Sequence, residues 1–201
     1  MKLYYAPGAC SLSPHITARE AEVEIELEKV NLTTHKTESG EDFNEINPKG
    51  YVPALRLDNG EILTEGPVIV QYIADQVLDK QLIPKKGTME RYRTEEWLLF
   101  ITSELHKPFG SLFRQDLPDS ERDLVTKKIA KRFEYINSSL KGKQFLMGDL
   151  FTVSDGYLFT ILTWAKPSGI ELAQYPELGQ YMDRVSARPA VQTALKEEGL
   201  F

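Results

Sequence analysis

The chain of 201 residues has few cysteines, no excess of positive charge and no long apolar run. Its one cysteine excludes an internal disulfide and fits a reducing compartment. A net charge of −6 disfavours binding to a phosphate backbone, so we expect no nucleic-acid partner. The apolar run at residues 156–165 is too short to cross a bilayer, and no signal-like run precedes Pro7. We therefore predict a cytoplasmic protein without a membrane partner.

Strand signals are confined to the first 80 residues. A short aromatic run at residues 3–5 predicts a strand, and Pro7-Gly8 ends it. An amphipathic segment begins near Ser11, and alternating residues 23–30 predict a second strand, parallel to the first. Two alternating runs then flank Asn59-Gly60, which is typical of a hairpin, and a helix follows to about residue 78. Residues 33–50 hold at most a short helix at 41–46. The order is βαβ-ββα.

Beyond a linker at residues 80–87, only helical spacing is present. Helices are predicted over 88–114, with Pro108 bending or breaking the first, and over 124–140, 153–164, 178–186 and 189–197. Thr152 and Asp155 form a capping-box pattern before the third of these helices. We predict two domains: an α/β domain at 1–79 and an all-α domain at 88–201.

Cys10 lies where the first strand turns into the first helix. Ser11 or Ser13 can cap this helix, whose free amides favour negative charge. A helix end stabilises a charge by roughly 1 kcal/mol, which lowers a thiol pKa from about 8.5 to roughly 7.5. The sequence therefore predicts a partly ionised, functional thiol. The alternative is that Cys10 is a small buried apolar residue.

Several motifs resemble one family over the whole chain. They are NPKGYVPAL at residues 47–55, LDNG at 57–60, LTEG at 63–66, ELHK at 104–107, FTVSD at 151–155 and RP at 188–189. Together they resemble the cytosolic glutathione transferases, and PGACS at residues 7–11 resembles the bacterial beta class. The resemblance implies a thioredoxin-like N-terminal domain, an all-helical C-terminal domain and a homodimer.

The resemblance also implies a glutathione site. Val52 precedes a cis-proline and offers its backbone to the cysteinyl part of glutathione. Glu65 pairs with the γ-glutamyl amine, and the amide of Gly66 meets its carboxylate. The full set implied to bind glutathione is Ala9, Cys10, His35, Tyr51, Val52, Glu65, Gly66, Ser103 and His106. A pocket for a small hydrophobic electrophile is implied at Phe109, Phe113, Tyr157 and Trp164, although aromatic residues at this spacing also form ordinary core.

This chain departs from the family pattern at three of these positions. Gly66 stands where many relatives have Ser, His35 stands where beta-class relatives often have Lys, and Leu99 stands where relatives can have Asn. Lys36 could replace His35 as the partner of the glycyl carboxylate. We therefore expect weaker glutathione affinity than in a relative with the full motif.

Three chemistries remain open for this site. In the first, the chain is a glutathione transferase whose thiolate is held by Cys10, by Tyr4 or Tyr5, or by Ser11. In the second, it is a glutathione-dependent thiol-disulfide or peroxide reductase acting through a Cys10 mixed disulfide, which a second glutathione resolves. In the third, it is a non-enzymatic ligand-binding protein on the same fold. We expect no metal in any of them.

Overall fold

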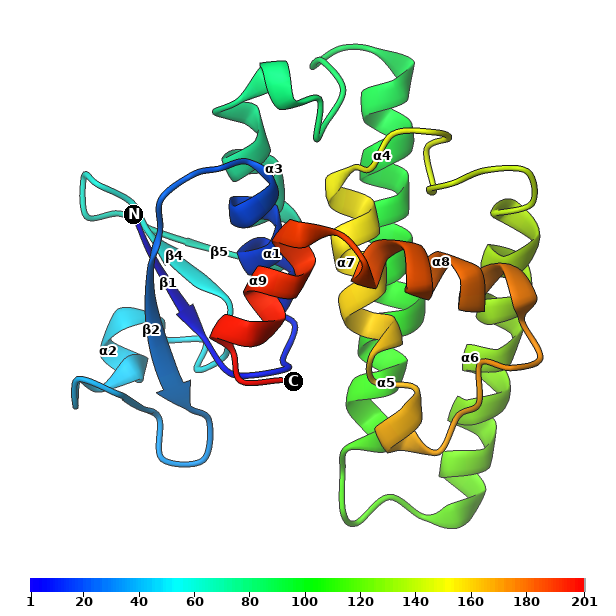
Figure 1. The fold of residues 1–201 in the computed structure, drawn as a ribbon. Coiled ribbons are helices and arrows are strands. Elements are labelled where there is room, and N and C mark those ends of the chain that lie inside the picture. The colour runs from blue at the N-terminus through cyan, green and yellow to red at the C-terminus, as the bar shows by residue number, and fades with distance from the viewer. Residues whose placement is uncertain (201) are drawn as a thin grey trace. The chain divides into compact units, whose positions relative to one another are not determined.

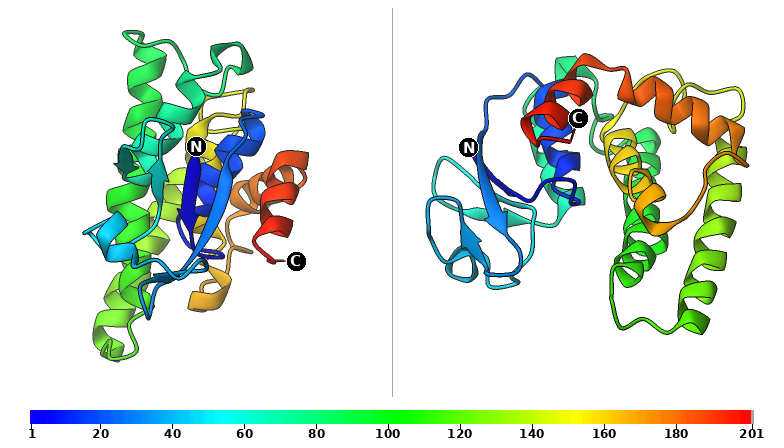
Figure 2. Two further views of the ribbon diagram at one scale, coloured as in Figure 1. Left: turned by 90° about the vertical axis from the view of Figure 1, so that its left-hand side faces the viewer. Right: turned by 60° about the horizontal axis from the view of Figure 1, so that its bottom comes forward.

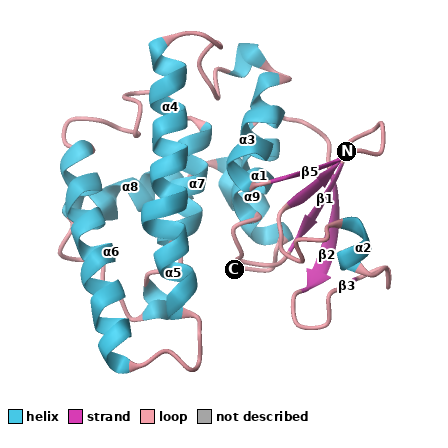
Figure 3. Cartoon of the chain, turned by 180° about the vertical axis from the view of Figure 1, so that it is seen from behind, coloured by secondary structure: helices cyan, strands magenta, loops and turns pink. Residues whose placement is uncertain are grey.

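The computed structural model describes residues 1–200, which form two compact units. Of these residues, the first unit comprises 1–83 and 188–200, and the second comprises Pro84–Ala187. All the strands of the described chain belong to the first unit (Figure 3).

The first unit is built on a mixed sheet of five strands in the order β3-β2-β1-β4-β5. The central strand β1 (Lys2–Tyr5) is parallel to β2 (Glu26–Asn31) and antiparallel to β4 (Ala54–Arg56). Strand β5 (Ile62–Thr64) pairs antiparallel with β4. The predicted parallel pair and hairpin are both confirmed. The sequence did not predict β3 (Lys36–Thr37), because two residues are too few for an alternating pattern.

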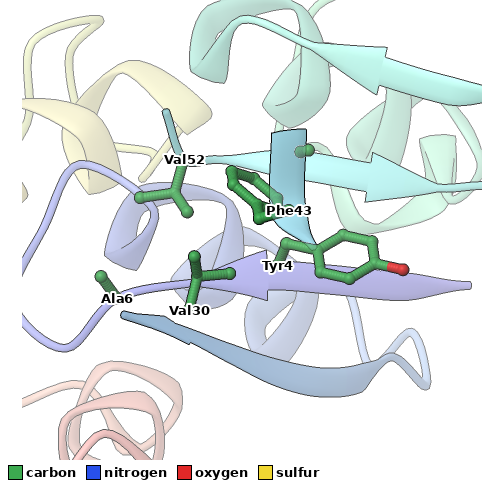
Figure 4. Packing of buried hydrophobic residues seen from close by; sticks show 6 residues of the cluster. Tyr4, Ala6, Val30, Phe43 and Val52 are labelled. Carbon is green, nitrogen blue, oxygen red and sulfur yellow. The ribbon is translucent and has the colours of Figure 1, made fainter. Parts of the chain in front are cut away.

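Helices cover both faces of this sheet (Figures 1 and 2). One face carries α1 (Leu12–Glu20), α3 (Gly66–Asp75) and α9 (Pro189–Glu197), and the short η1 (Leu78–Lys80) follows α3. The other face carries the short helix α2 (Phe43–Ile46), at the place predicted for it. Its Phe43 packs in a buried cluster with Tyr4, Ala6, Val30, Val52 and Ala54 (Figure 4).

The structure differs from the predicted domain division at the C-terminal end. The sequence assigned residues 88–201 to the helical domain, but α9 belongs to the first unit. Val191 and Ala194 of α9 are buried there, and Arg188 pairs with Glu20 through two contacts of 2.5 and 2.8 Å. The helical pattern predicts that α9 has an apolar face, but it contains no information about which surface that face covers.

The second unit consists of helices, as predicted. It contains α4 (Met89–Phe100), the π-helical segment η2 (Ile101–His106), α5 (Lys107–Leu112), α6 (Asp119–Ser139), α7 (Val153–Leu162), the short η3 (Lys166–Ser168) and α8 (Pro176–Ser186). Helix α7 is buried along its whole length, which explains its nearly continuous apolar sequence. Within residues 1–200, no helix has the length and apolar character needed to span a membrane.

Pro108 does not break the helical path from α4 to α5. A proline cannot donate to the carbonyl four residues earlier, and its ring clashes with that carbonyl. The π-helical segment η2 ends at His106, two residues before Pro108, and its wider turn accommodates the proline near the start of α5.

The predicted capping box at α7 is confirmed. The carboxylate of Asp155 accepts hydrogen bonds from the Thr152 N–H at 2.8 Å, from the Leu146 N–H at 2.9 Å and from the Tyr181 hydroxyl at 3.2 Å. Burial raises the pKa of Asp155 to about 6, and these hydrogen bonds oppose that shift. Asp155 therefore holds the start of a buried helix and is structural.

Candidate active site

The turn between β1 and α1 is closed by Ser11. The Ser11 hydroxyl accepts a hydrogen bond from the Ala6 N–H at 3.1 Å and donates one to the Ala6 carbonyl at 3.2 Å. The Ala9 N–H also donates to the Ala6 carbonyl, at 3.0 Å. Ser11 occupies the N-cap position of α1, but its side chain makes no capping bond, and Ser13 lies inside the helix. The predicted cap is therefore wrong, because the Ser11 hydroxyl is engaged at the end of the strand.

Cys10 lies in this turn, against the segment that leads into β4. Its thiol donates a hydrogen bond to the carbonyl of Val52, with a sulfur–oxygen distance of 3.3 Å. Burial raises the pKa of the Cys10 thiol to about 12; the backbone amides of Cys10 and Ser11 oppose this rise, and the charge of Glu65 adds to it. The prediction of a partly ionised thiol is wrong for this chain. A helix end changes a pKa by about one unit, whereas burial can change it by 3–5 units.

The Val52-Pro53 peptide bond is cis, as the family resemblance implied. The side chain of Val52 is buried in the cluster around Phe43, and its peptide lies just before β4. The side-chain amide of Asn47 donates to the carbonyl of Tyr51 at 2.7 Å and so anchors this segment.

Glu65 lies just before α3 with a positive φ of 68°, a conformation rare for residues other than glycine. Its carboxylate accepts hydrogen bonds from the Lys49 ammonium at 2.6 Å and from the Tyr51 hydroxyl at 2.8 Å. Lys49 also donates to the Thr64 hydroxyl at 2.9 Å. The structure therefore brings together Tyr51 and Glu65, which the resemblance implied separately to bind glutathione, and it adds Lys49. Lys49 belongs to the same NPKGYVPAL motif, but the motif alone does not show which side chain reaches Glu65.

Gly66 begins α3 beside the cis-proline. A Cβ atom added there would lie 3.6 Å from Cγ of Pro53, which is an ordinary van der Waals contact. The absence of a hydroxyl at this position is therefore not required by packing.

His35 and Ala9 flank this region. His35 has a positive φ of 52°, and its Nδ1 atom is buried without a hydrogen-bond partner. Its ring lies beside Gly50, since a Cβ atom added to Gly50 would be 3.4 Å from Cε1 of His35. Lys36, the alternative cation, lies 3.6 Å from the carboxylate of Asp42. Ala9 packs against the cluster around Phe43.

Tyr4 and Tyr5 point to opposite faces of the sheet, as successive strand residues do. The Tyr4 hydroxyl is buried without a hydrogen-bond partner and points away from Val52 (Figure 4). The Tyr5 ring lies 6.2 Å from the ring of His15, centroid to centroid. Within residues 1–200, neither hydroxyl is bonded to the Cys10 thiol, whose hydrogen bond goes to Val52.

The second unit brings the predicted aromatic residues together around Trp164. The rings of His106, Phe109 and Phe113 lie 5.1, 6.3 and 5.3 Å from it, and Nδ1 of His106 lies 2.7 Å from the Tyr157 hydroxyl. Phe109 and Tyr157 are buried, whereas Phe113 is 52% exposed. Ser103 is exposed, and its hydroxyl donates to the Leu99 carbonyl at 3.0 Å.

These features define a class of protein. A thiol after the first strand, facing the cis-proline segment that leads into the neighbouring strand of a mixed sheet, characterises a thioredoxin-like domain, which here is joined to an all-helical unit. Among residues 1–200, no group of three or more histidine, cysteine, aspartate or glutamate side chains is arranged to hold a metal ion.

Comparison with known proteins identifies the family. The glutathione S-transferase N-terminal domain model matches residues 8–76, and the glutathione S-transferase C-terminal domain model matches residues 100–189. Glutathione S-transferase GstA of Escherichia coli O157:H7 is 46% identical over 200 residues, covering 100% of both chains. The chain belongs to the glutathione S-transferase family, and both the predicted fold class and the resemblance are confirmed.

Two solved structures are similar over the full length. A bacterial beta class glutathione S-transferase from Sphingomonas chungbukensis is 45% identical with a TM-score of 0.97, covering 100% of both chains. A sphingomonad glutathione S-transferase complexed with glutathione is also 45% identical, with a TM-score of 0.96 and the same coverage. The structural neighbours of this chain therefore include members of the beta class.

The raised pKa predicts how fast Cys10 is alkylated. Because the thiolate is the nucleophile, the iodoacetamide rate should rise about tenfold per pH unit from about pH 7 to about pH 9.5, without a plateau. The single cysteine allows the rate to be followed by mass spectrometry of the intact chain. A short cysteine peptide, whose thiol has a pKa of about 8.5 and whose rate therefore begins to level off above about pH 8.5, is the control. A plateau for Cys10 near pH 8 would show instead that the helix end outweighs burial.

Proposed function

We propose that this protein conjugates the thiolate of glutathione to small hydrophobic electrophiles in the cytoplasm. The observation that carries the proposal is the Cys10 thiol, which is held protonated by burial and hydrogen-bonded to Val52 in front of the cis-proline. Family membership and the relative complexed with glutathione support the choice of co-substrate.

The first unit offers complementary groups for a γ-glutamyl tripeptide. The Glu65 carboxylate binds one ammonium group already, that of Lys49, so its position suits the γ-glutamyl amine. The start of α3 at Gly66 suits the γ-glutamyl carboxylate, because helix N-termini bind anions. The Val52 backbone is assigned to the cysteinyl part, with Ala9 beside it. His35 and Tyr51 are assigned to the glycyl end.

Cys10 acts in this proposal as a hydrogen-bond donor rather than as a nucleophile. A thiol with a pKa of about 12 is almost entirely protonated at neutral pH. When the cysteinyl N–H of glutathione takes over the Val52 carbonyl, the single S–H of Cys10 is free to turn and donate to the glutathione thiolate. That hydrogen bond lowers the pKa of the glutathione thiol and raises the concentration of the attacking thiolate. The same protonation disfavours a reductase in which Cys10 attacks a disulfide, because attack requires the thiolate.

Replacing Cys10 tests this role. Cys10→Ala should lower kcat/KM for conjugation of 1-chloro-2,4-dinitrobenzene about tenfold at neutral pH, because one hydrogen bond of about 1.5 kcal/mol is lost. The pH profile of kcat/KM should move up by about one unit, and Cys10→Ser, which keeps a donor, should restore part of the shift.

Disulfide reduction by the same variants separates the alternatives. A reductase acting through Cys10 loses all reduction of a glutathione mixed disulfide in Cys10→Ala, whereas a transferase keeps about a tenth of its conjugation activity. An unchanged pH profile of kcat/KM in Cys10→Ala would show that Cys10 does not take part in catalysis. Failure of the protein to bind glutathione would favour a non-enzymatic ligand-binding role.

The aromatic residues around Trp164 are assigned to the electrophile. Phe113 is half-exposed and stacks edge-to-face on Trp164, which leaves an aromatic surface able to receive an apolar ring. Phe109 and Tyr157 support this surface from the buried side. Ser103 and His106 are assigned to glutathione on the family resemblance, and His106 also holds the Tyr157 hydroxyl.

Gly66 provides a test of glutathione affinity. Gly66→Ser should lower KM for glutathione about fivefold, because the added hydroxyl supplies a hydrogen bond of about 1 kcal/mol to the γ-glutamyl carboxylate and has room beside Pro53. Steady-state kinetics at saturating electrophile and calorimetric titration measure this change. Gly179→Ser is the control, since Gly179 is also a helical glycine and a Cβ atom there meets nothing within 4 Å. An unchanged or weaker affinity in Gly66→Ser would place the carboxylate elsewhere, and a sub-micromolar Kd of the parent chain would contradict our expectation of weak binding.

We also propose that the protein forms a homodimer through α4. Met89, Tyr92 and Leu99 lie on one face of this helix and are exposed by 64, 57 and 67%. A cavity of about 350 Å³ lies beside it, lined by Glu96, Trp97, Phe100, Arg132 and Tyr135. Large apolar side chains gathered on one exposed helix face indicate a protein interface, and a second copy of the chain is the partner that the family resemblance implies.

Negative charges introduced on the exposed apolar face of α4 should dissociate the dimer. Tyr92→Glu combined with Leu99→Glu should convert a dimer to a monomer in sedimentation velocity, because two carboxylates would be buried without partners. Leu124→Glu is the control, since Leu124 is also 67% exposed but lies on α6. A monomeric parent chain, or a dimer that survives both substitutions, would contradict the proposal.

A further inference from the structure

A buried charge cluster joins α1 to the C-terminal end of α9. The ring of His15 is fully buried; its Nδ1 atom lies 2.9 Å from the Glu198 carboxylate and its Nε2 atom 2.7 Å from the Glu197 carboxylate. Nε of Arg19 donates to the same Glu197 carboxylate at 2.7 Å. The two helices lie side by side in Figures 1 and 2.

Glu197 and Glu198 lie at a helix C-terminus, where the helix macrodipole disfavours negative charge. Carboxylates at a helix C-terminus face the negative end of the macrodipole, and two adjacent ones also repel each other. The side chain of Glu198 is in addition completely buried. Such a charge is tolerated only with a partner, and both ring nitrogens of His15 can donate to carboxylates only when the ring carries two protons. Glu198 therefore occupies a position that both helix electrostatics and burial disfavour, and such residues are expected near functional sites.

The second oxygen of Glu198 reaches the turn that carries Cys10. It accepts a hydrogen bond from the Gly8 N–H at 2.9 Å, across 190 residues of sequence. Gly8 has a φ of 70°, and Leu200 packs over it, 3.5 Å from where a Cβ atom would be. Gly199, with a φ of 70°, reverses the chain after α9, and the Leu200 N–H returns to the Leu195 carbonyl at 2.9 Å. Glu198 and Leu200 thus both contact the turn at Gly8.

We propose that Glu198 is a positioning residue for the Cys10 thiol. His15 fixes one carboxylate oxygen to α1, and the other oxygen holds the Gly8 amide. The turn that contains Gly8 therefore cannot move away from α1 without leaving the buried Glu198 carboxylate without one of its partners. This contact keeps the partly buried Cys10 sulfur against the Val52 carbonyl, two residues further along the same turn.

Glu197 provides a control that distinguishes positioning of the Cys10 turn from general stabilisation of the protein. It contacts the same His15 ring and lies at the same helix end, but its other partner is Arg19 and not the turn. Both carboxylates contribute to the charge cluster, and only the Glu198 carboxylate connects the cluster to Gly8. Glu198→Gln and Glu197→Gln are therefore a matched pair.

The test is the alkylation rate of Cys10 by iodoacetamide at about pH 8. Glu198→Gln should raise this rate at least tenfold, because a loosened turn admits water and the thiol ionises more easily. Glu197→Gln should stay within about twofold of the parent chain. KM for glutathione should rise in Glu198→Gln with a smaller change in kcat. Alkylation requires no glutathione, so the inference can succeed or fail independently of the proposed transfer reaction.

Thermal unfolding by circular dichroism shows whether each variant is folded. Equal alkylation rates in Glu198→Gln and the parent chain would overturn the inference, and so would an equal rise in both variants, which would assign the effect to the His15 ion pairs in general. If Glu198→Gln does not fold, Leu200→Ala loosens the packing over the same Gly8 without altering a buried charge. Leu200→Ala should raise the rate about threefold, and an unchanged rate would also overturn the inference.

Discussion

The hydrogen bond from the Cys10 thiol to the Val52 carbonyl is the contact on which the candidate site depends. It joins the turn after β1 to the segment before β4, two parts of the chain that are 42 residues apart. Each part is anchored separately, the first by Ser11 at Ala6 and the second by Asn47 at Tyr51. The sulfur therefore occupies a defined position between two segments that cannot move independently.

Burial decides the chemistry available to that sulfur. The amides near the start of α1 favour the thiolate, but removal from water opposes it more strongly, and the nearby Glu65 carboxylate adds to the opposition. A protonated thiol next to a backbone carbonyl is a hydrogen-bond donor. The reactive thiolate in a glutathione transferase is supplied by the substrate. A hydrogen-bond donor at Cys10 therefore assists the reaction more than a second thiolate at this position would.

The C-terminal segment shows how a distant part of the chain contributes to this arrangement. Helix α9 follows the five α-helices of the second unit in sequence, but it packs on α1 and its last turn reaches Gly8. A glutamate at that position is unfavourable for the helix itself. It becomes stable only because His15 is buried opposite it, which requires the assembled first unit.

The sequence by itself determined the elements whose signals are local. The hairpin around Asn59-Gly60, the capping box at Thr152 and Asp155, and the change from strands to helices near residue 80 all follow from spacing and turn chemistry, and the family motifs implied the cis peptide before Pro53. Only the tertiary structure decided the protonation of Cys10, the pairing of Lys49 with Glu65 and the membership of α9 in the first unit. These depend on burial and on contacts between residues far apart in the chain, which no local pattern records.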